Sequence, residues 1–172
     1  HDFLKLIFLN TNSEIDHWVM KLSKIVRKIQ NKIRTSNYIS KSKHNVAHHY
    51  DLSDKLYELF LDPDRQYSCA YFNSPNDTLE QAQINKKELI YKKLLLEEGQ
   101  SVLDIGCGWG GMASHIYKKS NANVVGVTLS EEQIAYAKQR KINEKLDKVE
   151  YRLQDYRNVN ETYDRIVSVG MF

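Results

Sequence analysis

The stretch Val102-Leu103-Asp104-Ile105-Gly106-Cys107-Gly108-Trp109-Gly110-Gly111 decides the fold of this chain. Its first four residues predict a buried strand, and the glycines that follow predict a tight turn into a helix. Glycine tolerates a positive φ angle and has no Cβ, so the backbone can approach a ligand closely, while N–H groups at the helix start face that ligand. We therefore expect a nucleotide-like ligand at this turn, beside the Asp104 carboxylate.

The glycine spacing alone fits two kinds of nucleotide site. Gly106, Gly108 and Gly111 match the G-x-G-x-x-G pattern with which Rossmann domains hold a pyrophosphate. A dinucleotide site also needs an acidic residue at the end of the second strand, about 20 residues further on, and here that strand ends in Thr128. The pattern Asp-x-Gly-x-Gly-x-Gly is typical of enzymes that bind S-adenosylmethionine (SAM), and we favour SAM. NAD, FAD and a turn without a ligand are the alternatives.

Composition places the chain among ordinary soluble proteins. Its 172 residues are 41% hydrophobic and 27% charged, which suits one domain, or one domain with a helical appendage. No apolar run approaches the roughly 18 residues that span a bilayer, and no signal-peptide pattern is present. Cys69 and Cys107 do not suggest a disulfide framework, so we predict a cytoplasmic protein.

Basic residues are concentrated near the N-terminus. Residues 1–50 carry nine Lys or Arg against three acidic residues, and residues 18–34 predict a helix with an apolar stripe and a basic face. Such a helix either packs on the domain or lies on an anionic membrane surface, and we keep both interpretations. Because the helix lacks interleaved aromatic residues, we expect no nucleic-acid partner.

The rest of the chain predicts helices first and then a parallel α/β sheet. An N-terminal helical segment and a polar linker occupy residues 1–45, and the main domain occupies residues 46–172. A short helix is predicted to end near Leu61, before Pro63, and a long helix runs from a capping box at Thr78 to about Leu96, closed by Gly99. Strands are predicted at residues 102–105, 124–128, 149–153 and 163–169, with helices at 111–119 and 131–143. Since four strands are few for a doubly wound sheet, we expect a fragment of a longer protein.

In such sheets ligands bind beyond the carboxyl ends of the strands. There, Thr128 and Gln133 offer a hydroxyl and an amide for ribose hydroxyls, Asp155 offers an acceptor for an adenine amine, and Tyr156 offers a ring for packing. Each has an ordinary alternative. Thr128 and Gln133 also fit as caps of the next helix, which a capping box at Ser130 is predicted to start, and Asp155 also fits a solvated turn.

Several segments resemble cyclopropane-fatty-acyl-phospholipid synthases: His49–Leu52, Leu61–Pro63, Gln66–Phe72, Leu103–Gly111, Val127–Gln133, Leu153–Arg157 and Asp164–Phe172. The similarity runs from about Asn45 to the end of the chain. Its most specific part is Tyr67-Ser68-Cys69-Ala70-Tyr71, which is shared with mycolic acid cyclopropane synthases and a few lipid or alkaloid methyltransferases.

The resemblance implies a Rossmann-like class I SAM-dependent methyltransferase fold and a defined reaction. In this family the cis double bond of a phospholipid acyl chain attacks the methyl group of SAM, and a base, thought to be bicarbonate, removes a proton as the cyclopropane closes. Cys69 would line the bicarbonate pocket, as the one catalytic residue we carry over. The implied SAM contacts are Tyr67, Ser68, Asp104, Gly106, Gly108, Trp109, Gly110, Thr128, Leu129, Gln133, Asp155, Tyr156 and Arg157.

The cysteine, histidine and aromatic residues near the expected site also allow other roles. Alkene methylation needs no covalent enzyme intermediate, so Cys69 is not expected to be a nucleophile and is otherwise a small buried thiol. The pair His48-His49 lacks further ligands nearby, and we expect no metal. Tyr67, Tyr71 and Phe72 suit a site that shields a carbocation from water, or else a core.

The family places Glu-His directly after Gly170-Met171-Phe172, and that Glu binds bicarbonate. This chain stops first, so we expect that the fragment itself does not turn over. The expected partner is an unsaturated phospholipid at the inner face of a membrane, to which the protein binds peripherally, and a homodimer is a further expectation. The alternatives are a related C- or N-methyltransferase without ring closure and an inactive membrane-binding module.

Overall fold

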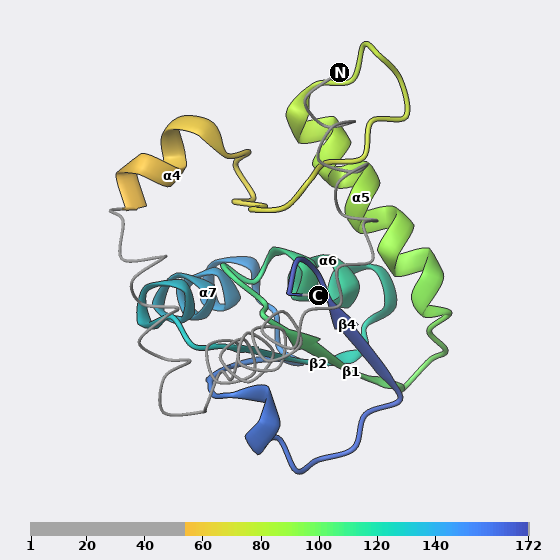
Figure 1. The fold of residues 1–172 in the computed structure, drawn as a ribbon. Coiled ribbons are helices and arrows are strands. Elements are labelled where there is room, and N and C mark those ends of the chain that lie inside the picture. The colour runs from red at the N-terminus through yellow and green to blue at the C-terminus, as the bar shows by residue number, and fades with distance from the viewer. Residues whose placement is uncertain (1–53, 172) are drawn as a thin grey trace, which may run out of the picture. The chain divides into compact units, whose positions relative to one another are not determined.

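The computed structural model describes residues 54–171 (Figure 1). In chain order the elements are α4 (Asp54–Phe60), α5 (Leu79–Leu94), β1 (Ser101–Ile105), α6 (Gly111–Ser120), β2 (Asn123–Thr128), α7 (Glu131–Glu144), β3 (Val149–Leu153), the 3-10 helix η1 (Tyr156–Asn158) and β4 (Arg165–Ser168). The basic helix predicted at residues 18–34, the linker and the domain boundary at residue 45 lie outside the described residues. Among the described helices, none has the length and hydropathy to cross a bilayer.

The four strands form one parallel sheet in the order β3-β2-β1-β4 (Figure 1). The chain moves outward from β1 to β3 and then returns to the other side of β1. In register, Ile105 lies beside Val127 and Ser168, so the carboxyl ends of the strands share one edge of the sheet. The loops after β1 and β4 therefore meet at the point where the strand order reverses, which is where ligands bind in open α/β sheets.

The main core lies between one face of the sheet and helices α5, α6 and α7. Alternate residues of the strands point into it, because successive strand side chains face opposite ways. Its members include Leu94, Val102, Met112, Ala113, Ile116, Val124, Ile134, Ala137, Val149, Tyr151 and Val167. A smaller cluster of Leu103, Ile105 and Val127 lies on the other face, where Ile166 of β4 is 59% exposed.

The predicted strands and helices are confirmed, and the differences lie at their ends. The hydroxyls of Thr78 and Ser130 cap α5 and α7 as predicted, by accepting from the N–H groups of Gln81 and Gln133. The two glutamine side chains do not return to the caps. Gln81 donates to Asn85 instead, and Gln133 pairs with a residue of β2, so each capping box is only half formed.

Helix α5 ends earlier than predicted, at Leu94 instead of about Leu96. Its cap is Leu95, at φ +47°, whereas Gly99, at φ +82°, lies four residues later in the turn before β1. The prediction that Gly99 closes the helix was therefore wrong. Arg165 of β4 donates to the carbonyls of Leu94 and Leu95 over 2.7 and 3.2 Å. A residue distant in sequence thus satisfies the last carbonyls of the helix, which no local pattern reveals.

Candidate functional site

The glycine turn after β1 is held against the neighbouring strand. Gly106, Gly108 and Gly110 have φ angles of +73°, +56° and +84°. The N–H groups of Gly106 and Cys107 both donate to the Val127 carbonyl, over 2.9 and 3.0 Å, and Gly110 N–H closes the turn onto the Cys107 carbonyl over 2.9 Å. The first two N–H groups of the turn are therefore bonded to β2.

Tyr151 of β3 fixes the far end of the turn. Its hydroxyl donates to the Gly110 carbonyl over 2.8 Å, and the side chain is only 4% exposed. Burial raises the pKa of the Tyr151 hydroxyl well above its usual value, so it stays protonated and keeps this hydrogen bond at physiological pH. A Cβ on Gly110 would lie 2.6 Å from that hydroxyl. Gly110 is thus required both by its backbone conformation and by its contact with Tyr151.

Asp104 acts as an acceptor for the start of α6. Helix α6 begins after Gly110, which has no side chain to cap it, and the N–H of Ala113 donates to the Asp104 carboxyl group. Asp104 is 2% exposed, and its Oδ2 has no hydrogen-bond partner among residues 54–171. Burial raises the pKa of Asp104 from 3.8 to about 7. One N–H that we expected to face the ligand therefore faces Asp104, whose contact with SAM stays a prediction.

The raised pKa of Asp104 predicts how stability depends on pH. Because the folded-state pKa lies above the unfolded value, this group stabilises the fold at low pH, and that contribution is lost as pH rises toward 7. Between about pH 5 and pH 8, we expect the free energy of unfolding of the wild type to fall by on the order of 2 kcal/mol relative to that of Asp104→Asn. Urea unfolding of both proteins across this range measures it. Parallel curves for the two proteins would show that Asp104 has an ordinary pKa.

An aromatic cluster holds the segment before α5 over the glycine turn. We define it as Tyr57, Phe60, Tyr67 and Trp109. The Tyr57 ring lies 4.9 Å from the Trp109 ring and 5.7 Å from the Tyr67 ring, centroid to centroid. Trp109, expected to contact SAM, is itself buried against Tyr57. The structure thus brings together the two segments on which the sequence analysis relied.

The loop after β4 reaches the same place. A Cβ on Gly106 would lie 2.6 Å from the sulfur of Met171. A Cβ on Gly170 would stand 3.9 Å from the Cβ of Ser68. Ser68 and the glycine turn are therefore both next to the loop after β4, at the point where the strand order reverses. Apart from its two chain neighbours, no residue of the described chain has an atom within 4 Å of a Cβ placed on Gly108, so the described residues leave the space above it open.

Polar residues that the sequence analysis missed fix this segment. Asp62 accepts from the N–H groups of Asp64 and Gln66 over 3.3 and 2.7 Å, forming a turn after Leu61. From α5, Gln83 and Lys86 bond the segment at residues 66–68. No local pattern marks Gln83 and Lys86 in the sequence, because their partners lie 15 to 18 residues away along the chain.

Asp64 joins its loop to two helices through ion pairs. Its carboxylate lies 2.5 Å from Lys87 of α5 and 2.8 Å from Arg140 of α7. A Cβ on Gly111, the first residue of α6, would overlap the Asp64 carboxylate and the Gln66 amide. The loop that carries Asp64 is therefore packed tightly on the start of α6.

At the end of β2 the predicted ribose ligands bond each other. Thr128 Oγ1 donates to Gln133 Oε1 over 2.8 Å, and both side chains are buried. The N–H of Ser130 donates to Thr128 Oγ1 over 3.3 Å. These contacts are local structure at the start of α7, whose cap is Ser130 and not Thr128 or Gln133. The predicted contacts with ribose, by Thr128, the half-buried Leu129 and Gln133, stay predictions. In such contacts Thr128 and Gln133 would have to bond the ribose in addition to each other.

At the end of β3, Asp155 is paired with Arg157. The Asp155 carboxylate accepts from the N–H, Nε and Nη2 of Arg157 over 2.9, 2.9 and 2.6 Å. Asp155 is buried, while Tyr156 and Arg157 are exposed at the same edge of the sheet. The alternative that Asp155 is solvated is wrong. The role of Asp155 as an acceptor for adenine stays a prediction, and the adenine amine would compete with Arg157 for the carboxylate.

The two cysteines differ in their surroundings, and both are free. Cys107 is buried in the glycine turn, and burial raises the pKa of its thiol. Cys69 is exposed next to Ser68, so the alternative of a small buried thiol is wrong. Tyr71 and Phe72 are also about half exposed and do not form a core within the described chain. Residues 54–171 contain no cluster able to hold a metal ion, and His48 and His49 lie outside that range.

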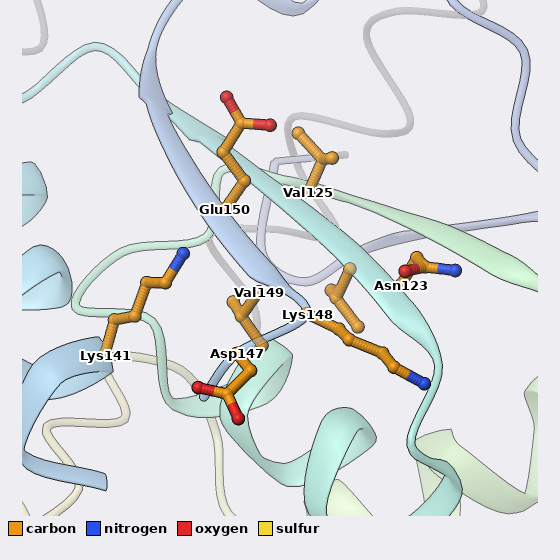
Figure 2. A pocket seen from close by; sticks show the side chains of 8 residues that line it. Asn123, Val125, Lys141, Asp147, Lys148, Val149 and Glu150 are labelled. Carbon is orange, nitrogen blue, oxygen red and sulfur yellow. The ribbon is translucent and has the colours of Figure 1, made fainter. Parts of the chain in front are cut away.

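A hollow of about 330 Å³ lies at the opposite end of the sheet (Figure 2). It is lined by the first residues of β2 and β3 and by Lys141 of α7. Figure 2 shows Lys141, Asp147, Lys148 and Glu150 around it, with both signs of charge. Since ligands of such sheets bind at the carboxyl ends of the strands, we assign no function to this hollow.

Most of the chain is similar to proteins of one known family. The family described as Mycolic acid cyclopropane synthetase matches residues 38–172. The chain belongs to this family. The cyclopropane-fatty-acyl-phospholipid synthase of Escherichia coli K12 is 52% identical over 124 residues, covering 72% of this chain and 31% of that protein. A probable fatty acid methyltransferase of Pseudomonas putida is 46% identical over 130 residues, covering 74% and 33%.

The same family provides a solved structure of similar fold. A crystal structure of mycolic acid cyclopropane synthase CmaA1, complexed with SAH and CTAB, is 44% identical with a TM-score of 0.72, covering 74% of this chain and 45% of that one. The predicted family and the Rossmann-like class I SAM-dependent methyltransferase fold are thus confirmed. The chain spans about a third of the length of the E. coli and P. putida relatives.

Proposed function

We propose that the whole protein uses SAM to convert the cis double bond of an unsaturated phospholipid acyl chain to a cyclopropane. Family membership and the 52% identity to the E. coli synthase support this reaction. The observation that carries the proposal is the meeting of Tyr67-Ser68-Cys69, the glycine turn and the loop after β4 at one edge of the sheet. This edge is where a parallel sheet binds its ligand.

The residues at this edge fit SAM. Apart from its chain neighbours, no described residue lies within 4 Å of a Cβ placed on Gly108, and below the turn the buried Asp104 keeps one carboxyl oxygen without a partner among residues 54–171. SAM supplies an electrophilic methyl group. The alkene electrons form the new carbon–carbon bond as the carbon–sulfur bond breaks, and a base takes a proton from the transferred carbon as the ring closes. We assign that base to bicarbonate, bound beside the exposed Cys69.

The proposed substrate places the protein at the inner face of a membrane, with association driven by the basic helix predicted at residues 18–34. Attraction to anionic lipid amounts to about 1 kcal/mol per basic residue near the surface and is weakened by salt. The expectation of a homodimer stays a prediction.

The proposal predicts the lipid product. We expect the whole protein, incubated with SAM and vesicles of cis-unsaturated phospholipid, to yield chains that are one methylene heavier and lack the double bond, with faster conversion on anionic than on neutral vesicles. Mass spectrometry of the released fatty acids, before and after mild hydrogenation that saturates alkenes and leaves cyclopropanes intact, measures the product and its rate of formation. Recovery of unchanged lipid at all vesicle charges would contradict the proposal.

A substitution separates ring closure from binding of SAM in the same assay. Cys69→Ala is expected to slow conversion more than it weakens binding of S-adenosylhomocysteine, because we place Cys69 beside the base. Equal losses in rate and in affinity would remove Cys69 from the catalytic step and assign it to the binding of SAM.

The second candidate is methylation of an acyl chain without ring closure. It is favoured by the 46% identity to the probable fatty acid methyltransferase of P. putida. Without ring closure the carbocation loses a proton from a neighbouring carbon, so the product is a methyl-branched alkene of the same mass as the cyclopropane. Mild catalytic hydrogenation adds two hydrogen atoms to the branched alkene and none to the cyclopropane, so the mass after hydrogenation distinguishes the two products.

A further inference from the structure

Lys86 and Ser68 form a polar pair next to the loop after β4. Lys86 Nζ donates to Ser68 Oγ over 2.7 Å, and Lys86 is only 7% exposed. From the same helix, Gln83 Nε2 donates to the carbonyls of Gln66 and Ser68 over 3.1 and 3.0 Å. Helix α5 thus fixes both the main chain and the side chain of Ser68.

This pair has hydrogen-bond donors to spare. An ammonium group has three N–H donors, and a hydroxyl that accepts one bond still has a hydrogen to donate. Within residues 54–171, Ser68 is the one hydrogen-bond partner of Lys86 Nζ, and the Ser68 hydroxyl has no acceptor. A buried ammonium with so few partners is costly unless an anion compensates it. The pair is therefore suited to bind an anion.

The nearby carboxylates do not bond this ammonium. Asp62 and Asp64 lie close enough to act on the charge of Lys86. However, the oxygens of Asp62 accept from backbone N–H groups, and Asp64 is paired with Lys87 and Arg140. Their hydrogen bonds within the described chain thus fix the loop and leave the donors of Lys86 and Ser68 for another group.

From this geometry we infer that Lys86 is a positioning residue for a carboxylate subsite. It orients the Ser68 hydroxyl and adds a buried positive charge, so that the two side chains together bind the α-carboxylate of SAM. The inference rests on the proposed function, which supplies SAM as the ligand. The α-carboxylate is the anionic group of SAM, and Ser68 lies near the glycine turn where the methionine part of SAM is expected. A charged donor also makes a stronger hydrogen bond to a carboxylate than a neutral one.

Two ligands test this role by calorimetry with the whole protein: S-adenosylhomocysteine and its decarboxylated analogue. We expect Lys86→Met to lose about tenfold in affinity for the first, as expected for one charged hydrogen bond, and less than about twofold for the second. Equal losses for both ligands would overturn the inference and leave Lys86 as a structural clamp of the Ser68 segment. If the wild type binds neither ligand, the proposed function itself fails.

Lys87 provides the matched control. It is adjacent on α5 and equally buried at 7% exposure, but its ammonium pairs with Asp64. Lys87→Met is expected to lower thermal stability while the ratio of the two affinities stays as in the wild type. A change of that ratio as large as the one in Lys86→Met would contradict a specific role of Lys86.

The pH dependence of binding gives a readout that survives if Lys86→Met fails to fold. Burial lowers the pKa of Lys86 to about 8, with Lys87 lowering it further and Asp62, Asp64 and Cys69 opposing. Arg keeps its charge at any of these pH values. The affinity of the wild type for S-adenosylhomocysteine, relative to Lys86→Arg, should fall severalfold as pH rises above about 8. A ratio independent of pH would show that the charge of Lys86 does not act on the ligand.

Discussion

Gly108→Ala is expected to lower the affinity for S-adenosylhomocysteine by roughly a hundredfold while the protein stays folded. The φ angle of +56° lies in the left-handed region, where alanine costs only about 1 kcal/mol. Apart from its two chain neighbours, no described residue has an atom within 4 Å of the added Cβ. The methyl group thus enters the space in which we place the ligand, and the loss appears in binding. Calorimetry measures the affinity and urea unfolding measures the stability.

Gly99 is a matched control for this substitution. Its φ angle is +82°, and a Cβ there also meets nothing within 4 Å. It lies in the turn before β1, at the opposite end of the strand from the glycine turn. Gly99→Ala should therefore strain the backbone while binding S-adenosylhomocysteine as the wild type does. If Gly108→Ala also binds normally, SAM does not lie over the glycine turn.

Most of the fold could be predicted from the sequence because its signals are local. Runs such as Val124–Thr128 are rich in β-branched residues and are bounded by polar ones, so strands are found to within a residue or two. The errors arise where a distant residue intervenes. Arg165 satisfies the end of α5, and Thr128 takes the Gln133 side chain that a capping box would use.

The site was predicted only in part, for a similar reason. The turn at residues 106–111 and the Tyr67-Ser68-Cys69 segment carry recognisable patterns, and the structure brings them together. Lys86 and Gln83 carry none, since their partners lie 18 and 15 to 17 residues away in an irregular segment. Asp104 belongs to the pattern of the turn, but nothing in that pattern shows that its carboxyl group also accepts from the N–H of Ala113 at the start of α6.

Gly110→Ala is expected to destabilise the fold by about 3 kcal/mol, which is the largest effect on stability that we anticipate. Two causes add. Alanine is strained at a φ angle of +84°, and its Cβ would lie 2.6 to 2.8 Å from the hydroxyl and ring of Tyr151. Because Tyr151 is packed in the core, it cannot move aside without disturbing its neighbours.

A double-mutant cycle with Tyr151→Ala separates the two causes of this loss. Removing the ring of Tyr151 removes the overlap and leaves only the backbone strain, so Gly110→Ala should cost about 1 kcal/mol in that background. Free energies of unfolding from urea titrations of the four proteins give the coupling. The same cost in both backgrounds would mean that Tyr151 does not limit residue 110. A reduced cost would show that Tyr151, 41 residues further along the chain, is the reason why residue 110 must be glycine. The hydrogen bond between these two residues also joins β3 to the proposed cofactor site.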